Sequence, residues 1–228
     1  MSFNIAIDGP AGAGKSTIAK ALAGKLSFLY VDTGAMYRAM ACFFLTHGIP
    51  ADDESALRAA CADIYISLAY ADGAQRVLLN GTDISDQIRR EEVGNMASAT
   101  SGYPFVREKL LRLQQDLAKE NDVIMDGRDI GTCVLPDAQL KIYLTASVRT
   151  RAKRRYQELE AKGQDCDLEE IEKDIEARDY RDMHREIAPL KAAADAITVD
   201  SSEMSIEEVV REIYGLARKA GLEIRICG

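Results

Sequence analysis

The sequence predicts an α/β protein with a parallel sheet, a small β-rich insertion and a long charged helical segment. Two observations predict the sheet. Short apolar segments alternate with helical patterns along the 228 residues, and the first apolar segment enters a glycine-rich loop that opens a helix. Two turn dipeptides close together, Asp72-Gly73 and Asn80-Gly81, predict the insertion. The length fits one domain with an insertion or two small domains.

The chain begins with the alternation of a β-α-β unit followed by a second helix. Residues 3–8 form a short apolar segment that ends at Gly-Pro, which predicts a buried strand. A helical pattern covers residues 15–26, and a second strand is predicted at 28–32. The next helix is predicted to run to about Thr46, with Thr33 as its cap. This order of elements is typical of a parallel sheet.

The middle of the chain has the pattern of small antiparallel hairpins, and helical and strand patterns then alternate again. The apolar stretches 64–71 and 76–79, each followed by a turn dipeptide, predict a β insertion over residues 62–90. The later elements are helices at 90–100 and 105–119, strands at 123–126, 140–144 and 196–200, a charged helical stretch over 147–186 broken near Gly163, and a last helix from Ser205. The core segments are therefore expected at 1–61, 91–146 and 187–228.

Composition and charge exclude several classes of protein. Hydrophobic residues make up 47% and charged residues 29%, as in ordinary globular proteins. A net charge of -8 argues against a nucleic-acid coat protein, because binders of the phosphate backbone carry a basic face. The longest apolar run, residues 39–45, is too short to span a membrane, and no signal peptide is visible. Five scattered cysteines predict reduced thiols, so we expect a cytoplasmic protein without a membrane partner.

The strongest motif follows the first predicted strand. It has the pattern G-x-x-x-x-G-K-[ST] and consists of Gly9, Pro10, Ala11, Gly12, Ala13, Gly14, Lys15, Ser16 and Thr17. Its glycines let the backbone curl so that N–H groups face inward, and the helix N-terminus adds its positive dipole end. Lys15 is expected to reach the β- and γ-phosphates, and the Ser16 hydroxyl to bind Mg²⁺. The motif predicts binding of a nucleoside triphosphate with magnesium.

Two further segments follow predicted strands and carry charges suited to a phosphate. In residues 32–38, Thr33 and the helix N-terminus can hold an oxyanion, and Arg38 adds a cation. Residues 126–131 read Asp-Gly-Arg-Asp-Ile-Gly, and ligands of open α/β folds lie beyond the carboxyl ends of strands. Taken alone, the first segment can also be a capped helix with a surface arginine, and the second a charged turn with local ion pairs.

The charged segment 147–186 begins with a run of basic residues between positions 149 and 155. On a helix, three of them fall on one face that could close over a triphosphate as a lid: Arg151, Arg154 and Arg155. The alternative is a solvated basic helix start.

A second basic pattern lies at the end of the same segment. Its members are spaced as one helical stripe: Arg178, Arg181, Asp182 and Arg185. A buried stripe of cations needs an anionic partner, which a bound nucleotide would supply. The alternative is an exposed ladder of ion pairs with Asp174 and Asp179 as neighbours.

These motifs favour a small kinase over the other classes of nucleotide-binding protein. A GTPase-type switch would need an Asn-Lys-x-Asp motif, which the sequence lacks, whereas the abundant arginines suit phosphoryl transfer. Two alternatives stay open. One is a kinase with another acceptor, such as UMP, AMP or a non-nucleotide alcohol, and the other is a nucleotide-binding switch or regulatory ATPase.

The residues 9–17, 32–38, 126–131 and 178–185 together resemble the bacterial cytidylate kinase family over essentially the whole chain. The first loop is common to P-loop proteins, whereas Asp-Gly-Arg-Asp-Ile-Gly and the arginine-rich stripe are more specific. The resemblance implies a nucleoside monophosphate kinase fold with a five-stranded parallel sheet flanked by helices. It also implies a monophosphate-binding insertion at 62–90, and a helical lid with an arginine-rich helix at 147–186. The implied reaction transfers the γ-phosphoryl group of ATP to CMP or dCMP with Mg²⁺, in a monomer that binds no nucleic acid.

The resemblance also implies roles for individual side chains. Lys15 and Asp126 would act at the transferred group and the magnesium, with lid residues Arg154 and Arg155. The acceptor phosphate would be held by Thr33, Arg38 and Arg128, the base by Ser98, Arg107 and Asp129, and the ribose by Arg178, Asp182 and Arg185. A carboxylate at Asp129 can accept from the amino group of cytosine but would repel the carbonyl of uracil, so CMP and dCMP are expected to react well above UMP.

Overall fold

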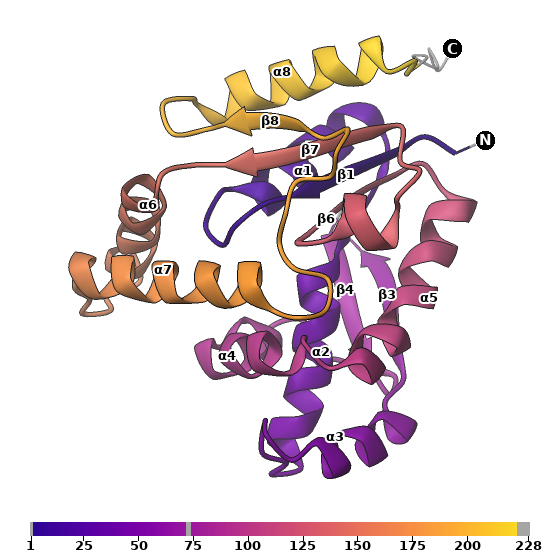
Figure 1. Ribbon diagram of the computed structural model, residues 1–228, viewed down its shortest axis with the longest axis vertical. Helices are drawn as coiled ribbons and strands as arrows, with labels where there is room; N and C mark the ends of the chain where they lie inside the picture. Colours follow the sequence, from indigo (N-terminus) through magenta and orange to yellow (C-terminus); the bar gives the residue numbers. More distant parts are fainter. Residues whose placement is uncertain (1, 72–73, 223–228) are drawn as a thin grey trace. The chain divides into compact units, whose positions relative to one another are not determined.

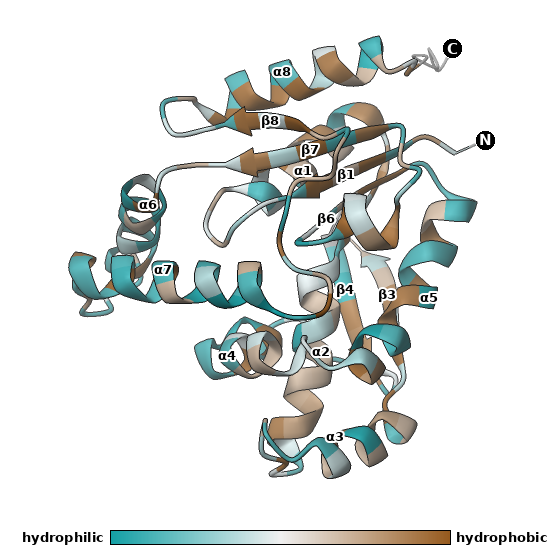
Figure 2. Cartoon of the chain, in the orientation of Figure 1, coloured by the Kyte–Doolittle hydropathy of each residue, from teal (hydrophilic) through white to brown (hydrophobic). Residues whose placement is uncertain are grey.

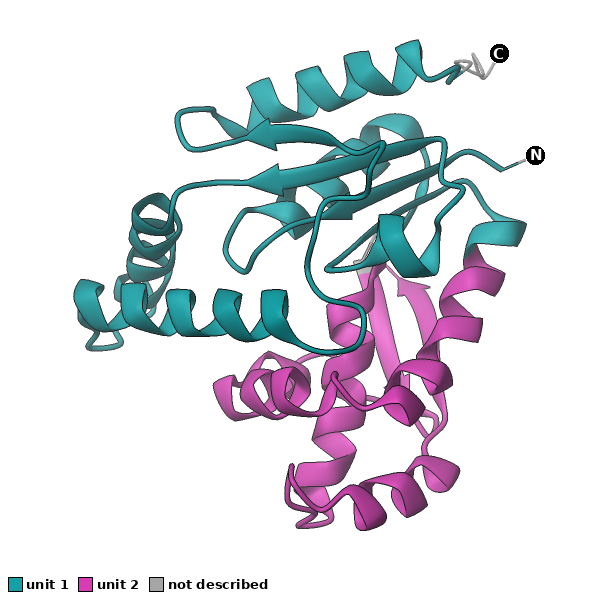
Figure 3. Cartoon of the chain, viewed as in Figure 1, with its two compact units in different colours: residues 1–30, 118–228 teal, residues 31–117 magenta. Residues whose placement is uncertain are grey.

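The computed structural model describes residues 2–71 and 74–222, and these fall into two compact units (Figure 3). Unit 1 comprises residues 1–30 and 118–228, and unit 2 comprises residues 31–117. The chain therefore begins in unit 1, forms unit 2 as one continuous stretch, and then forms the rest of unit 1.

A five-stranded parallel sheet forms the core, as the sequence predicts. Its strand order is β2-β6-β1-β7-β8, and its strands are β1 (Asn4–Asp8), β2 (Leu29–Asp32), β6 (Val123–Gly127), β7 (Leu140–Thr145) and β8 (Ile197–Asp200). The central strand β1 pairs in parallel with β6 on one side, Ile5 opposite Ile124, and with β7 on the other, Ile5 opposite Leu140. Parallel strands all end at one edge of the sheet, so the loops that follow β1 and β6 come together there.

Helices α1 (Lys15–Leu26) and α8 (Ile206–Lys219) pack on the sheet in unit 1 (Figure 1). Ile18 and Leu22 of α1 and Ile213 of α8 join strand residues such as Ile5 and Ile142 in one apolar cluster. Figure 2 shows the strands as mostly hydrophobic, whereas α8 alternates between hydrophobic and hydrophilic residues. Both faces of such a sheet are buried, which explains the nearly continuous apolar strands in the sequence.

The ends of the helices follow the sequence signals with one exception. Helix α8 begins with a capping box formed by Ser205 and Glu208, at the predicted position. The sequence predicts Thr33 as the cap of α2 (Thr33–Thr46), and this prediction is wrong. Asp32 is the N-cap, and its carboxylate accepts the Ala35 N–H at 2.8 Å, because an ionised acceptor binds a helical N–H more strongly than a hydroxyl does.

The charged segment forms two helices, α6 (Val148–Glu160) and α7 (Leu168–His184). The break lies where the sequence predicts it, and Gly163 there has a φ of 69°, which glycine adopts without strain. Figure 2 shows both helices as largely hydrophilic. Among the described residues, no helix is long and apolar enough to cross a membrane.

Unit 2 holds α2, most of α5 and a small antiparallel sheet. Its other elements are α3 (Glu54–Ala60), β3 (Ile66–Ala71), β4 (Ala74–Leu79), β5 (Thr82–Asp83), α4 (Glu91–Thr100) and α5 (Pro104–Glu120). Asn80 and Gly81 both have positive φ, which confirms the predicted turn between β4 and β5. The predicted turn at Asp72-Gly73 lies outside the described residues. The sequence patterns do not predict α3 and β5.

Candidate active site

The glycine-rich loop between β1 and α1 has the backbone that its sequence predicts. Gly9, Gly12 and Gly14 all have positive φ, at 152°, 75° and 89°. A side chain at Gly9 would also overlap the carbonyl oxygen of Leu144, so only glycine fits there. The loop ends in helix α1, whose first N–H groups have no partners within the helix. Loop and helix together form a cradle for an anion.

Lys15 lies buried at the base of this cradle, with only 6% of its surface exposed. Its Nζ donates to the carbonyl oxygen of Pro10 at 2.8 Å. Burial, together with the nearby Arg128 guanidinium, lowers the pKa of Lys15 to about 7. A buried cation beside a second cation favours the binding of an anion, because the anion replaces the lost hydration of both.

Ser16 and Asp126 place a hydroxyl and a carboxylate side by side, which are the kinds of oxygen ligand that Mg²⁺ prefers. The Ser16 hydroxyl donates to Asp126 Oδ2 at 2.8 Å, and the Tyr30 hydroxyl donates to Asp126 Oδ1 at 3.0 Å. Hard oxygen ligands from one or two side chains, completed by phosphate oxygens and water, are the usual magnesium set. Among the described residues, no group of three or more His, Cys, Asp and Glu residues could hold a metal ion. The sequence analysis did not identify Tyr30, because a tyrosine in an apolar strand is indistinguishable from a core residue.

The segment after β6 is fixed by a buried carboxylate that the sequence analysis also missed. Asp8, at the end of β1, accepts the N–H groups of Ile130 and Gly131 at 2.7 and 2.8 Å. These residues open a π-helical turn, Ile130–Val134, which follows the strand directly. Burial raises the pKa of Asp8 to about 6, although the two N–H groups oppose this rise. Asp8 therefore fixes the conformation of the backbone directly after Arg128 and Asp129.

The Asp8→Asn variant is expected to have a flatter dependence of stability on pH. The raised pKa means that the protonated form of Asp8 favours folding below pH 4, and that this contribution is lost as the pH rises through about 6. Between pH 4 and pH 7 the free energy of unfolding of the unmodified protein should therefore fall by about 3 kcal/mol relative to the variant. Urea unfolding of both proteins across this range measures the difference, and parallel curves would contradict the assignment.

The loop after β6 makes two ion pairs with helix α7. Arg128 Nε donates to Asp182 Oδ2 at 2.9 Å, and Arg185 Nη2 to Asp129 Oδ1 at 3.4 Å. Both carboxylates are buried. The structure thus brings together four of the predicted site residues, on a loop and a helix that are far apart in the sequence.

The predicted stripe on α7 is only partly correct. Asp182 is buried and Arg178 and Arg185 are partly buried, but Arg181 is exposed. At about 100° per residue, Arg181 lies about 60° around the helix from Arg178 and about 100° from Asp182, so it is at the edge of the stripe. The alternative of an exposed ladder is also wrong at Asp179, which is buried and paired with Arg151 at 2.6 Å.

The three arginines predicted on one face of α6 have different surroundings. Arg151 is buried, so it does not share an exposed face with the others. Arg154 donates through Nη2 to the carbonyl oxygen of Ser201 at 2.7 Å. Arg155 is exposed and pairs with Glu158 at 3.3 Å. The difference arises because α6 packs along α7, which covers one side of the helix.

The other predicted site residues belong to unit 2. Thr33 is buried at the start of α2, where Arg38 Nη2 pairs with Asp32 at 3.3 Å. Arg107 donates through Nη1 to the carbonyl oxygen of Ser101 at 3.3 Å, and its guanidinium lies 5.7 Å from the centre of the Tyr37 ring. The carbonyl oxygen of Ser98 accepts from the hydroxyl of the same Ser101 at 3.1 Å. Ser98 and Arg107 are thus held around one turn.

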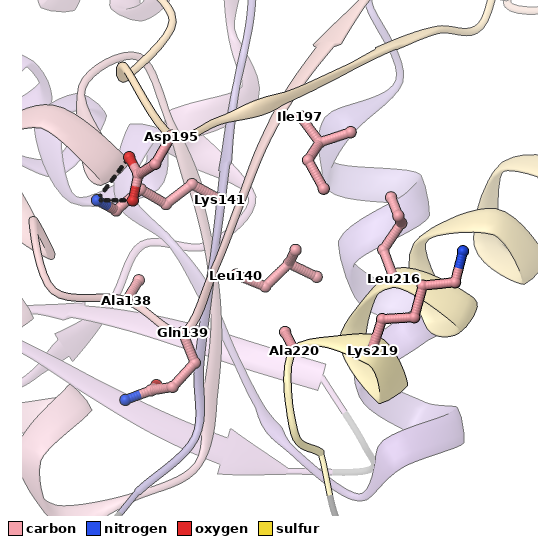
Figure 4. Close-up of a pocket in the computed structure, with 9 residues that line it drawn as sticks. All are labelled: Ala138, Gln139, Leu140, Lys141, Asp195, Ile197, Leu216, Lys219 and Ala220. Carbon is pink, nitrogen blue, oxygen red and sulfur yellow. Dashed lines mark hydrogen bonds and ion pairs between the residues drawn. The ribbon is translucent and has the colours of Figure 1, made fainter.

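A cavity of about 270 Å³ lies elsewhere in unit 1 and contains none of the predicted site residues (Figure 4). Its walls include Leu140 and Ile197, at the amino ends of β7 and β8, and Leu216 of α8. Figure 4 shows Lys141 paired with Asp195 at its border, through bonds of 2.8 and 2.9 Å. The glycine-rich loop follows the carboxyl end of β1, so the cavity lies at the opposite end of the strands.

This fold and this site define a P-loop nucleotide-binding protein. The family model described as cytidylate kinase matches residues 5–219. The cytidylate kinase of Geobacillus sp. (strain WCH70) is 51% identical over 218 residues, covering 96% of this chain and 97% of that relative. The cytidylate kinase of Lactobacillus gasseri is 50% identical over 219 residues, covering 95% and 94%. The chain belongs to the cytidylate kinase family and is a phosphotransferase with ATP as its phosphoryl donor.

Solved structures give the same fold at low sequence identity. An uncharacterized protein from Eubacterium ventriosum has a TM-score of 0.51 at 12% identity, covering 95% of this chain and 99% of that chain. At this level of identity the similarity concerns the fold alone.

Proposed function

We propose that this phosphotransferase transfers the γ-phosphoryl group of ATP to CMP or dCMP, and so forms ADP and CDP or dCDP in pyrimidine nucleotide metabolism. One observation carries the proposal. The loop after β1 and the loop after β6 lie on neighbouring strands, and each presents a buried charged group, Lys15 on the first and Asp129 on the second. The cytidylate kinases that share about half of the residues support the choice of acceptor.

The donor side is assigned to the glycine-rich loop. Its N–H groups and Lys15 bind the phosphates, and Ser16 and Asp126 hold Mg²⁺, which neutralises phosphate charge when bound. The hydrogen bond from Ser16 to Asp126 supports this assignment, because it already places a hydroxyl and a carboxylate together. The acceptor phosphate is an anion at neutral pH and requires no strong base, so the side chains mainly position and neutralise charge.

Thr33, Arg38 and Arg128 hold the acceptor phosphate, and we assign the insertion 62–90 to this part of the reaction. A hydrogen bond of 3.0 Å from the Asp32 N–H to the Gln75 amide oxygen supports that role, since it ties the hairpin to the start of α2. Arg178 and Asp182 contact the ribose, and Arg185 supports them.

Base selection is assigned to Ser98, Arg107 and Asp129. Asp129 is buried, and its Oδ1 atom pairs with Arg185 Nη2 at 3.4 Å, which supports the proposal that this side chain is held in one place. An ionised carboxylate accepts from the amino group of cytosine and repels the carbonyl oxygen of uracil. Exclusion of water is assigned to the segment 147–186, with Arg154 and Arg155 in the lid.

We further propose a monomeric, cytoplasmic enzyme, and the free cysteines of the described chain support a reducing compartment.

The decisive experiment measures ADP release from Mg-ATP with CMP, dCMP, UMP, AMP, GMP and dTMP, and without an acceptor. Strong stimulation by CMP and dCMP alone is the expected result. Stimulation by a different monophosphate would keep phosphoryl transfer and overturn the roles of Ser98, Arg107 and Asp129. Hydrolysis that no acceptor stimulates would contradict the proposal and favour a regulatory ATPase.

A further inference from the structure

Arg151 of α6 is almost entirely enclosed, with 3% of its surface exposed, and it contacts the glycine-rich loop directly. Its Nη1 donates to the carbonyl oxygen of Ala11 at 2.9 Å, and its Nε to the carbonyl oxygen of Ala146 at 2.9 Å. The side chain therefore joins the loop after β1 to the segment after β7. Nothing in the motif of the loop itself indicates this contact.

Asp179 of α7 fixes the third nitrogen of the same guanidinium. Arg151 Nη2 donates to Asp179 Oδ2 at 2.6 Å, and both residues are buried. An ion pair in such surroundings is held rigidly, because moving either partner away leaves a buried charge uncompensated. All three nitrogens of the Arg151 guanidinium thus have partners, and one of these partners lies on α7.

The contact with Ala11 determines where the next N–H group of the loop points. The described chain contains no cis peptide bond, so the carbonyl of Ala11 and the N–H of Gly12 point in opposite directions. Because Arg151 holds the carbonyl, the Gly12 N–H is turned away from Arg151. A Cβ atom at Gly12 would lie 3.3 Å from Arg151 Cβ, which shows how closely the loop rests on this side chain.

A second contact acts in the same way two peptides further on. The Ser201 hydroxyl lies 3.4 Å from the carbonyl oxygen of Ala13, and Arg154 donates to the Ser201 carbonyl oxygen. The outer side of the loop is therefore bonded through its carbonyl groups. Holding these two carbonyls turns the N–H groups of the same peptides, those of Gly12 and Gly14, to the opposite side, and N–H groups of such a loop bind phosphate oxygens.

We propose that Arg151, held by Asp179, is a positioning residue that orients the N–H groups of the glycine-rich loop toward the phosphates of the donor nucleotide. The inference rests on the proposed function only in taking ATP as the donor. Arg151 acts through the backbone and does not touch the nucleotide, because its three nitrogens are directed to Ala11, Ala146 and Asp179.

Three variants separate positioning from a purely structural role. Arg151→Lys keeps a cation opposite Asp179, but its single nitrogen cannot replace the three separate nitrogens that reach Ala11, Ala146 and Asp179. Asp179→Asn keeps the shape of the carboxylate without its charge. The double variant Arg151→Met with Asp179→Leu removes both charges, and apolar replacement of a buried pair commonly preserves folding. Glu172→Gln is the matched control, because Glu172 also joins α7 to α6, through Arg149 at 2.8 Å, without reaching the loop.

The measurements are calorimetric binding of ADP without acceptor, KM for ATP and for CMP, and amide hydrogen exchange of residues 10–15. We expect the Kd for ADP and the KM for ATP to rise about 10- to 100-fold in the three variants, as for other small misplacements of binding groups. The KM for CMP should change less than about threefold, and exchange in the loop should accelerate. The Glu172→Gln variant should match the unmodified protein.

The proposal is overturned if the folded variants bind ADP within about twofold of the unmodified protein and exchange in the loop is unchanged. If a single variant fails to fold, the binding of ADP and the exchange in the loop can still be measured in the double variant. Binding of ADP without an acceptor does not depend on which monophosphate is phosphorylated. A failure of the proposed CMP specificity therefore appears only in the acceptor assay and is distinguishable from a failure here.

Discussion

Replacing Lys15 by methionine should lower kcat about 1,000-fold or more, which corresponds to about 4 kcal/mol of transition-state stabilisation. The ammonium group is buried at the base of the glycine-rich loop and bonds to the Pro10 carbonyl oxygen. Methionine has a similar length and fills the same space, so the change removes the charge and leaves the packing. A buried charge aimed at a transferred phosphoryl group acts in surroundings of low dielectric, where its effect is large.

The measurement for Lys15 is steady-state ADP release at saturating ATP and CMP. Lys25→Met is the control, because Lys25 is an exposed residue in the last turn of the same helix, 4.6 Å from the centre of the Tyr214 ring. Its kcat should equal that of the unmodified protein. A Lys15→Met enzyme with near-normal turnover would refute the assignment of this lysine to the transferred group.

Replacing Arg128 by alanine should lower kcat/KM about 100- to 1,000-fold, or about 3 to 4 kcal/mol. The change removes a cation from the loop after β6 and leaves the buried Asp182 without the partner that lies 2.9 Å away. Both effects weaken the neutralisation of charge when two phosphates approach each other. Arg128→Lys keeps the charge without the fork of donors, so it should recover only part of the loss.

The measurement for Arg128 is kcat and KM for ATP and CMP, together with the melting temperature. Arg211→Ala on the exposed side of α8 is the control, and its kinetics should be unchanged. A loss confined to the melting temperature, with kcat/KM intact below the transition, would show that Arg128 only anchors α7.

The parts of the fold that the sequence predicts are those specified by neighbouring residues. The glycine-rich loop, the start of α8 at Ser205 and the break at Gly163 depend on local backbone preferences and on short-range hydrogen bonds. The five strands follow from runs of apolar residues, because both faces of a parallel sheet are covered. The cap of α2 is missed because Asp32 and Thr33 are both good caps in adjacent positions.

The parts that the sequence does not predict depend on partners far along the chain. In the sequence, Asp8 is indistinguishable from any other residue at the end of a strand. Its role depends on the N–H groups of Ile130 and Gly131, which donate to its carboxylate in the fold. Arg151 and Asp179 are each surface residues by composition, and only the packing of α6 along α7 makes them a buried pair. Periodicity along one helix cannot identify such partners, because it describes which side of that helix a residue occupies and not what covers it.

The division of unit 1 into two pieces of sequence has a consequence for how the protein is made. The central strand β1 emerges from the ribosome early, but Asn4 pairs with Val123 and Ile5 with Leu140. Unit 2 is one continuous stretch and is synthesised in full before either partner strand exists. Pairings between distant segments form slowly, and unpaired apolar strands are exposed to aggregation in the meantime. The glycine-rich loop can therefore acquire its final shape only when the second half of the chain has been translated.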